Sequence, residues 1–441
     1  MTQPPRNIQP RIHDLMGELP TAANLPANFR FLSPEKISLP NSIPLYVVQT
    51  GSYDFCQIEI GIKAGTWYQN KKLQAGFTNM MLMKGCKGKT ESEISEFIDY
   101  RGAYLIPSVD QDFASLSLYS LTRHLKELLP LMSDILQQPD FPESEFTIER
   151  SKAKQRFQID LGKVDFLARQ EMSHMVYGDN HPYGQIALPV DYEQIQASDL
   201  HDFYKYHYHN RISYILASGN ISDDVLNLIT QTFGGSGIEN QNPIIEPNKS
   251  FNNGSPYFRH IPKAGASQTA IRFGKRAPTA QNPDYSGLKI LNVILGGYFG
   301  SRLMMNIRED KGLTYGIGSA YQPMQHDGML IIAAEVKAEN TALAILETKN
   351  ELQKLCENLI SEEELYLVKN FMAGDFYRSI DGPSAIASRI RQIIRFDLPS
   401  DHFINHLQNL YHITPKDILN LSQKYLKSES FYSIAVGEYQ D

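Results

Sequence analysis

An arginine and a tyrosine in the second half of the chain have the types and spacing to act on a peptide. They stand in the segment LGGYFGSRLMMNIREDKGLTYGIGS, from Leu295 to Ser319. Ser301 is a suitable N-cap for a helix through SRLMMNIRED, Gly312 ends that helix, and LTYGIGSAY alternates like a strand. Arg308, in the last helical turn, and Tyr315, early in the strand, should then converge at one corner. A guanidinium and a phenol placed there can hold a peptide carbonyl or a carboxylate.

The same segment carries three glycines that permit backbone conformations closed to other residues: Gly296, Gly297 and Gly300. From the residues alone, a simpler interpretation of the pair is favoured. Arg308 would complement the helix dipole and Tyr315 would fill a gap in the packing.

Two of the twelve histidines, His402 and His406, are spaced to share one helix face and reach a common metal. The zincin motif requires a glutamate directly after the first histidine, and Phe403 stands there instead. We therefore interpret the pair as partly exposed helix histidines without a ligand role. The sequence also contains no P-loop, dinucleotide fingerprint or G-x-S-x-G elbow, so phosphate-binding and serine-hydrolase functions lose their usual support.

Composition excludes several other classes of protein. The 441 residues include 42 Lys+Arg and 49 Asp+Glu, and 42 − 49 gives a net charge of −7 with no block of consecutive cations, which argues against nucleic acid as a partner. Three distant cysteines favour a reducing compartment. The first residues lack an apolar h-region, and no stretch approaches the roughly 20 apolar residues of a membrane span. We expect a cytoplasmic protein, or a periplasmic one if a signal peptide has been removed.

The order of elements repeats about 220 residues apart. Alternating strands begin at Phe55 and again at Ser267, and a similar helix begins after Pro142 and again after Ser361. The Asn-, Pro- and Gly-rich run 237–256 marks a linker between domains 1–236 and 257–441. The sequence predicts an α+β fold of two homologous domains, each a mostly antiparallel sheet with long helices packed on one face.

Several motifs together resemble the insulinase and pitrilysin superfamily, whose catalytic members carry the inverted zinc motif H-x-x-E-H. They are GTWYQNKKLQAGF from Gly65, MLMKG from Met81, DYRGAYL ending at Leu105, HPYG from His181, and SRLMMNIREDKGLTYG from Ser301. The last is the most specific, because residue types with different physical roles recur in a fixed order. The resemblance covers nearly the whole chain.

The resemblance places the zinc motif on the helix that precedes MLMKG, and the required residues are missing there. Aligned on MLMKG, the two histidine positions fall on Gly76 and Met80, with Asn79 in place of the catalytic glutamate. Aligned on the preceding glycine, the two histidine positions fall on Asn79 and Met83, and Leu82 takes the place of the catalytic glutamate. Neither alignment leaves a usable ligand set.

The third ligand of the family is a glutamate on a second helix about 75 residues further on. The matching stretch here, from Arg150 to Gln170, has Gln155 and Gln158 but no glutamate. Zinc in this class needs three protein ligands, and a thioether does not replace imidazole. The resemblance therefore implies a catalytically inactive member that holds no cofactor itself, with zinc expected on a partner chain.

In two-chain peptidases of this superfamily, one subunit holds zinc and the other supplies an arginine and a tyrosine, which match Arg308 and Tyr315. The resemblance thus implies a non-catalytic, substrate-binding subunit whose partners are an H-x-x-E-H chain and a peptide or unfolded polypeptide. The loop GGYFG, from Gly296, is much shorter than the glycine-rich substrate-binding loop of the mitochondrial processing peptidases in this superfamily, so the resemblance does not extend to recognition of presequences. Two alternatives remain: a structural scaffold like the respiratory-complex core proteins, and a stand-alone peptide-binding homodimer.

Overall fold

The first half of the chain is built around a six-stranded sheet. The computed structural model describes residues 33–51, 54–209, 211–235 and 254–439. The strand order is β1-β2-β8-β3-β7-β6, and every neighbouring pair is antiparallel except β2 with β8. The strands are β1 (Glu35–Ser38), β2 (Pro44–Gln49), β3 (Cys56–Ile62), β6 (Tyr104–Val109), β7 (Ala114–Ser120) and β8 (Tyr214–Gly219).

The second half repeats this topology in a five-stranded sheet. Its order is β11-β12-β10-β13-β9, and again one pair, β13 with β9, is parallel. Each strand has a counterpart in the first sheet, β1 being the extra one there. The duplication predicted from the sequence is therefore present as shared topology. The strands are β9 (Phe258–Pro262), β10 (Thr269–Ala277), β11 (Thr314–Pro323), β12 (Gly328–Val336) and β13 (Tyr432–Gly437).

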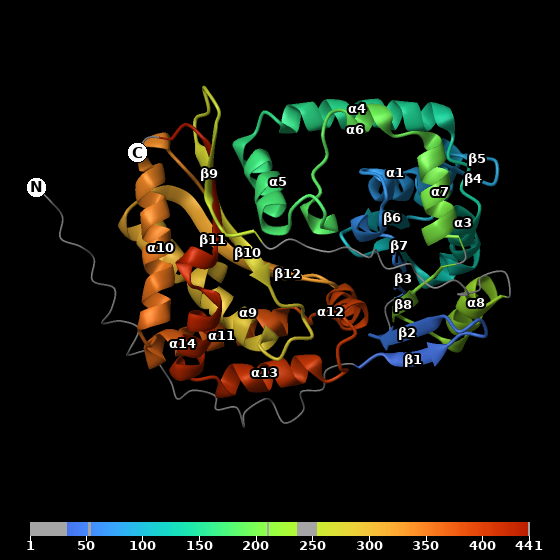
Figure 1. Ribbon diagram of the computed structural model, residues 1–441. Coiled ribbons are helices and arrows are strands. Elements are labelled where there is room, and N and C mark those ends of the chain that lie inside the picture. The colour runs from blue at the N-terminus through green and yellow to red at the C-terminus, as the bar shows by residue number, and fades with distance from the viewer. Residues whose placement is uncertain (1–32, 52–53, 210, 236–253, 440–441) are drawn as a thin grey trace, which may run out of the picture.

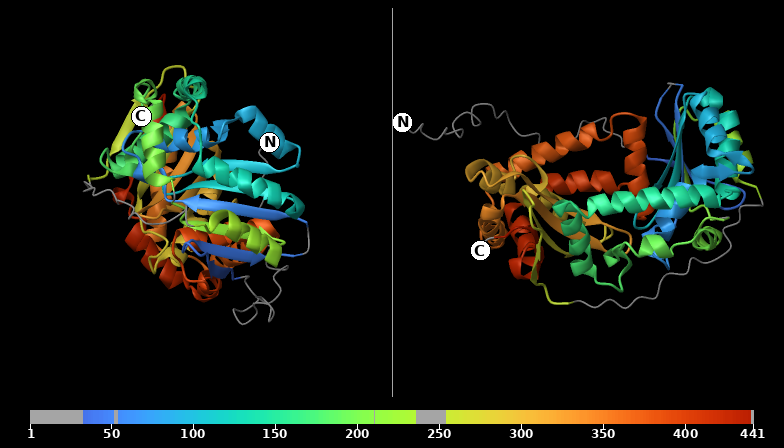
Figure 2. Two further views of the ribbon diagram at one scale, coloured as in Figure 1. Left: turned by 90° about the vertical axis from the view of Figure 1, so that its right-hand side faces the viewer. Right: turned by 90° about the horizontal axis from the view of Figure 1, so that it is seen from above.

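Helices cover the outer face of each sheet (Figures 1 and 2). Those of the first half are α1 (Gln74–Met81), α2 (Glu91–Asp99), α3 (Leu125–Gln137), α4 (Glu143–Asp160), α5 (Val164–Tyr177), α6 (Asp191–Gln194), α7 (Ala197–His207) and α8 (Asp223–Phe233). Those of the second half are α9 (Tyr285–Asn292), α10 (Thr341–Glu357), α11 (Glu362–Arg378), α12 (Pro383–Arg395), α13 (His402–His412) and α14 (Pro415–Tyr425). A two-stranded hairpin, β4 (Gly85–Cys86) with β5 (Lys89–Thr90), follows α1. The α+β prediction is confirmed.

The two halves exchange one helix each. Helix α4 runs across the top of Figure 1 from the first half to the second, and there α5 packs on β10 and β13. In return, α12 packs on β8 and β2. Each sheet is therefore covered on both faces, and its inner face takes the apolar side chains of a helix from the other half. Met172 of α5 belongs to the first core but lies among residues of β13, and Ile390 of α12 belongs to the second core among residues of β8.

Two glycines at matching positions of the two sheets give a test of how rigidly their neighbours are held. Gly61 in IEIG of β3 lies against the ring of Tyr214, and Gly274 in IRFG of β10 lies against the end of Met172. A methyl group at either position would overlap its neighbour. The Tyr214 hydroxyl is held by Glu59 at 2.7 Å, whereas a methionine side chain can rearrange. We expect Gly61→Ala to lower the free energy of unfolding by about 2–3 kcal/mol and Gly274→Ala by about 1 kcal/mol or less.

Urea denaturation of the two variants measures this difference. Equal losses would contradict the idea that only the ring of Tyr214 is fixed in place.

Candidate functional site

Helix α1 holds the positions that match the zinc motif, and their side chains do not form a metal site. Gly76 has no heavy atom within 4 Å of where a Cβ would lie, so the position of the first histidine is open space. Asn79 is 3% exposed and its Nδ2 donates to the buried Tyr208 hydroxyl at 3.3 Å. Met80 and Met83 are half-buried and pack against the first core.

The remaining position, Gln155, is exposed on α4. Glycine has no side chain that could bind a metal, and the other four positions hold two neutral amides and two thioethers. None of these groups is a usual protein ligand of zinc. Within the described part of the chain, no group of three or more His, Cys, Asp or Glu side chains is arranged to hold a metal ion. The donor set at these five positions therefore does not fit zinc.

The segment that carries Arg308 and Tyr315 has an unusual backbone. The expected helix through SRLMMNIRED is present, but Met304–Asp310 is π-helical, and a second π-helical stretch, Val293–Gly297, ends α9. Short π-helical insertions are rare and often mark functional sites. Gly312 has a φ of +63°, as expected for a helix stop, and β11 begins at Thr314.

Arg308 and Tyr315 come from adjoining ends of these elements, and among the described residues no hydrogen bond or cation–π contact joins them. The Arg308 guanidinium lies 4.6 Å from the ring centroid of Phe299, and its Nε is 3.6 Å from a carboxylate oxygen of Glu309. Tyr315 is 91% exposed. Within the described residues neither side chain donates a hydrogen bond, so both groups can still take a ligand.

The three predicted glycines lie where space is short. A Cβ on Gly296 would overlap the backbone of Ser319 in β11, and one on Gly300 would overlap the ring of Tyr298. Gly297 is exposed and close to Val293. Gly296 and Gly300 therefore have a packing role that is sufficient to explain them, and their role in substrate binding stays a prediction.

Tyr315 lies at the rim of a pocket of about 340 Å³ on the edge of the second sheet. Arg272 of β10 forms part of the wall and is itself 5% exposed, donating to the Asp165 carboxylate of α5 and lying 3.9 Å from a Glu335 oxygen. Strand β11 is the edge strand, and its register shifts between Thr314 and Ile317. The pocket therefore combines an exposed phenol, a free strand edge and charged groups.

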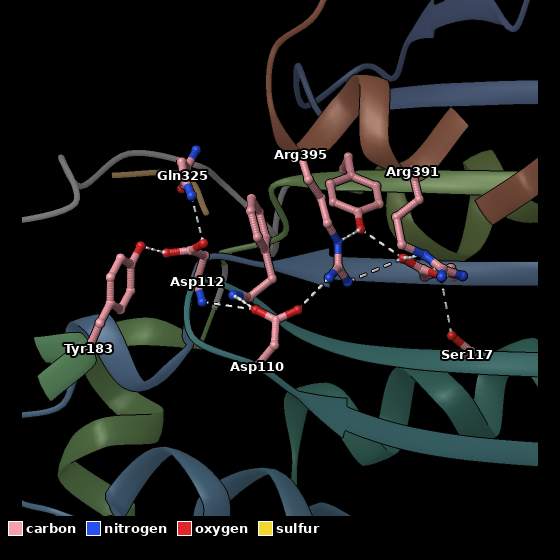
Figure 3. Close-up of polar contacts among 10 residues, drawn as sticks. Asp110, Asp112, Ser117, Tyr183, Gln325, Arg391 and Arg395 are labelled. Atoms are coloured by element: carbon pink, nitrogen blue, oxygen red, sulfur yellow. Dashed lines mark hydrogen bonds and ion pairs between the residues drawn. The ribbon is translucent and has the colours of Figure 1, made fainter. Parts of the chain in front are cut away.

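A buried ionic cluster joins the two halves, and the sequence pattern did not predict it. Glu59 of β3 is 1% exposed, and it accepts from Arg391 Nε at 2.6 Å and from the Tyr214 hydroxyl at 2.7 Å (Figure 3). Arg395 donates to that hydroxyl at 2.8 Å and to Asp110 at 2.7 Å. The available signal was a single acid inside the apolar strand CQIEIGI.

The HPYG motif also serves the contact between halves. The Tyr183 hydroxyl donates to Asp112, whose other carboxylate oxygen accepts from the Gln325 backbone amide at 2.8 Å (Figure 3). Burial raises the pKa of Asp112, although these two hydrogen bonds oppose the rise. Beside it, the rings of Trp67 and His326 stack with their centroids 4.0 Å apart. The motif therefore fixes the turn between β11 and β12 against the first half.

The interpretation of His406 as partly exposed was wrong. Its ring is 8% exposed because it faces inward from α13, and its Nδ1 lies 2.5 Å from the Ser286 hydroxyl oxygen. Burial, and secondarily the nearby Lys289, lower the pKa of His406 to about 3 and that of His402 to about 4.

These two histidines predict a pH dependence of stability. The unfolded chain binds their protons below about pH 6.5, whereas the folded chain does not until about pH 3–4. Their contribution is thus complete above pH 6.5 and is lost as the pH falls, by at most about 1.4 kcal/mol per pH unit for each histidine. His406→Asn should flatten the fall in urea midpoint between pH 6.5 and 4. An unchanged slope would contradict this assignment.

The geometry defines a class: a duplicated α+β fold with a degenerate metal helix in its first half. Comparisons with known proteins identify the family to which this fold belongs. Residues 46–178 match the model described as insulinase (peptidase family M16), and residues 194–372 match the one described as peptidase M16 inactive domain. These two matches cover most of the chain, which therefore belongs to the insulinase family, peptidase family M16.

The chain is also similar to individual members. It is 25% identical over 344 residues to an uncharacterized zinc protease, YmxG, of Bacillus subtilis, covering 75% of this chain and 81% of that one. It is 23% identical to the mouse mitochondrial-processing peptidase subunit beta, covering 78% and 72%. A crystal structure of a peptidase M16 inactive domain from Pseudomonas fluorescens has the same fold, with a TM-score of 0.85, 22% identity and coverage of 92% and 99%.

Proposed function

We propose that this protein is the non-catalytic, substrate-binding subunit of a two-chain zinc peptidase. The single observation that carries the proposal is the contrast between α1 and β11. The former has Gly76, Asn79 and Met80 at the positions of the zinc motif, and the latter presents Tyr315 almost fully to solvent. A partner chain with an intact H-x-x-E-H helix would hold zinc, the catalytic base and the attacking water.

In this proposal Arg308 and Tyr315 donate hydrogen bonds to the scissile carbonyl near the partner's zinc. A positioned guanidinium and phenol stabilise the negative charge that develops on that oxygen, irrespective of which chain holds the metal. The position of Arg308 over Phe299 supports this role, because a cation–π contact orients the guanidinium while leaving its N–H groups available.

The substrate we propose is a peptide or an unfolded polypeptide segment. The place of β11 at the edge of its sheet supports this choice, because an extended chain can add to an edge strand through backbone hydrogen bonds of any sequence. The part of that edge near Ser319 is covered by Asn292 and Gly296, so the addition we propose is to the part near Tyr315. The mouse relative is by its name one subunit of a processing peptidase, which supports an assembly of more than one chain.

Of the described residues, none lies in a helix long and apolar enough to cross a bilayer.

The proposal is tested with this protein and an H-x-x-E-H member of the family from the same source. Cleavage of a fluorogenic peptide should be negligible for this chain alone and rise by orders of magnitude when the two are mixed, with co-elution in gel filtration. A chelator-sensitive activity of the lone chain would overturn the ligand argument. No increase and no co-elution would exclude the subunit role, and peptide titration would then separate a peptide-binding homodimer, which saturates, from a scaffold, which does not bind.

A further inference from the structure

A second cavity, of about 290 Å³, lies in the helical layer of the second half and shares no lining residue with the pocket at Tyr315. Its volume is near the lower end of the roughly 300–1,000 Å³ of small-molecule sites, so it admits a ligand of about one residue. Much of the wall is apolar or aromatic, and is formed by Val293, Tyr321, Phe371, Met372, Phe376 and Phe403.

Two cations face this cavity without a carboxylate in ion-pair contact. Arg389 of α12 uses Nε and Nη2 on the Ser379 hydroxyl, at 3.0 and 2.6 Å, and its guanidinium carbon lies 5.4 Å from the ring centroid of Phe403. Lys289 of α9 lies 5.1 Å from the ring centroid of Tyr285. No ion pair within 4.0 Å involves either cation in the described part of the chain.

One other charged group of the cavity, Asp375, acts on Arg389 through space, but the two side chains form no ion pair within 4.0 Å in the described part of the chain. Asp375 accepts from Arg378 at 2.8 Å on the exposed side of α11. His406 stays neutral because its pKa is lowered to about 3. A half-buried cation without a paired carboxylate recovers only part of its lost hydration, so an anion that enters the cavity would be favoured there.

The cavity also offers an unused acceptor. Asn292 donates from Nδ2 to the Ser319 carbonyl at 3.3 Å, while its Oδ1 is buried and has no hydrogen-bond partner. An amide N–H of a ligand would satisfy that oxygen once the Asn292 side chain turns it toward the cavity. The ligand chemistry is therefore a carboxylate, a neighbouring N–H and a large apolar body.

We propose that this cavity binds the carboxyl-terminal residue of a peptide, or an N-acyl amino acid, with a large apolar side chain. Arg389 and Lys289 take the carboxylate, Asn292 accepts the amide N–H, and the aromatic wall encloses the side chain. This assignment does not depend on the proposed peptidase role.

Isothermal titration of the full chain with N-acetylphenylalanine tests the proposal. The acid should bind with one site per chain. Its primary amide, which has the same body without the charge, should bind at least tenfold more weakly. Arg389→Gln should weaken binding of the acid at least tenfold and Lys289→Gln several-fold, while Lys416→Gln, the same change at an exposed site on α14, should leave it unchanged.

Three results would overturn the assignment. The acid and its amide could bind equally, or neither could bind. Inorganic phosphate could compete as well as the acid does, which would mean that the apolar body contributes nothing. Binding by Arg389→Gln and Lys289→Gln could equal that of the unaltered chain. If Arg389→Gln does not fold, the contrast between acid and amide and the Lys289→Gln variant still decide.

Discussion

Replacing Glu59 with glutamine should lower the free energy of unfolding by about 3 kcal/mol. The substitution keeps the shape of the side chain but leaves Arg391 and Arg395 without their shared carboxylate. Removing one partner of a buried pair typically costs about 3–5 kcal/mol, because the other charge stays buried and uncompensated. We expect the lower end of that range, since the side chains of Arg391 and Arg395 keep 25% and 16% exposure and Asp110 still pairs with Arg395.

Urea unfolding of Glu59→Gln measures the loss. The control is Glu96→Gln, the same change at an exposed position of α2. The control should change the midpoint little, since substitutions at exposed sites usually stay within about 0.5 kcal/mol. Adding Arg391→Gln to Glu59→Gln should restore part of the lost stability, because one stranded cation is then removed. A strictly additive further loss would mean that the cluster is not a coupled unit.

The duplicated architecture was predictable because it rests on local patterns. The strands from Phe55 and Ser267 alternate with period two, and the helices after Pro142 and Ser361 repeat the same early acids and apolar spacing. These patterns gave the α+β class and the repeat, both of which the structure has. The proposed boundary at 237–256 lies mostly outside the described residues, so it stays a prediction.

The exchange of helices was not predictable, because amphipathic spacing shows that a face is buried but not against which sheet. The partners of the buried charges could not be predicted for the same reason. The sheet positions IEIG and IRFG hold Glu59 and Arg272 at matching places, and each finds its partner on the helix of the other half: Arg391 on α12 and Asp165 on α5. Only the three-dimensional packing shows that opposite charges meet there.

Some features of the candidate site were likewise predictable from local sequence, and others were not. Missing zinc ligands are read directly from residue types, and the residues at those positions, Gly76, Asn79 and Met80, lie on α1. The packing role of Gly296 and the burial of His406 depend on elements distant in sequence, so no local signal gives them. The exposure of Tyr315 likewise follows from its place at the edge of the sheet.

The largest expected effect on activity is that of Tyr315→Phe. In the reconstituted pair, loss of the phenol should lower kcat by about 10²–10³-fold with little change in KM, because a donor aimed at a developing oxyanion acts mainly in the transition state. Since Tyr315 is 91% exposed, stability should stay within about 0.5 kcal/mol of the unaltered chain. Steady-state cleavage of a fluorogenic peptide, together with urea unfolding of the same samples, separates the two effects.

The matched control is Tyr100→Phe, which alters another tyrosine that is 88% exposed, at the end of α2. Arg308→Lys should also lose most of the rate, because lysine keeps the charge but not the planar fork, and Phe299→Ala should cause a smaller loss by releasing the guanidinium. If both Tyr315→Phe and Arg308→Lys keep the full rate while the chains still co-elute, these residues do not touch the substrate. The chain would then act as a scaffold for its partner, because the assembly would form and cleave peptides without help from Tyr315 or Arg308.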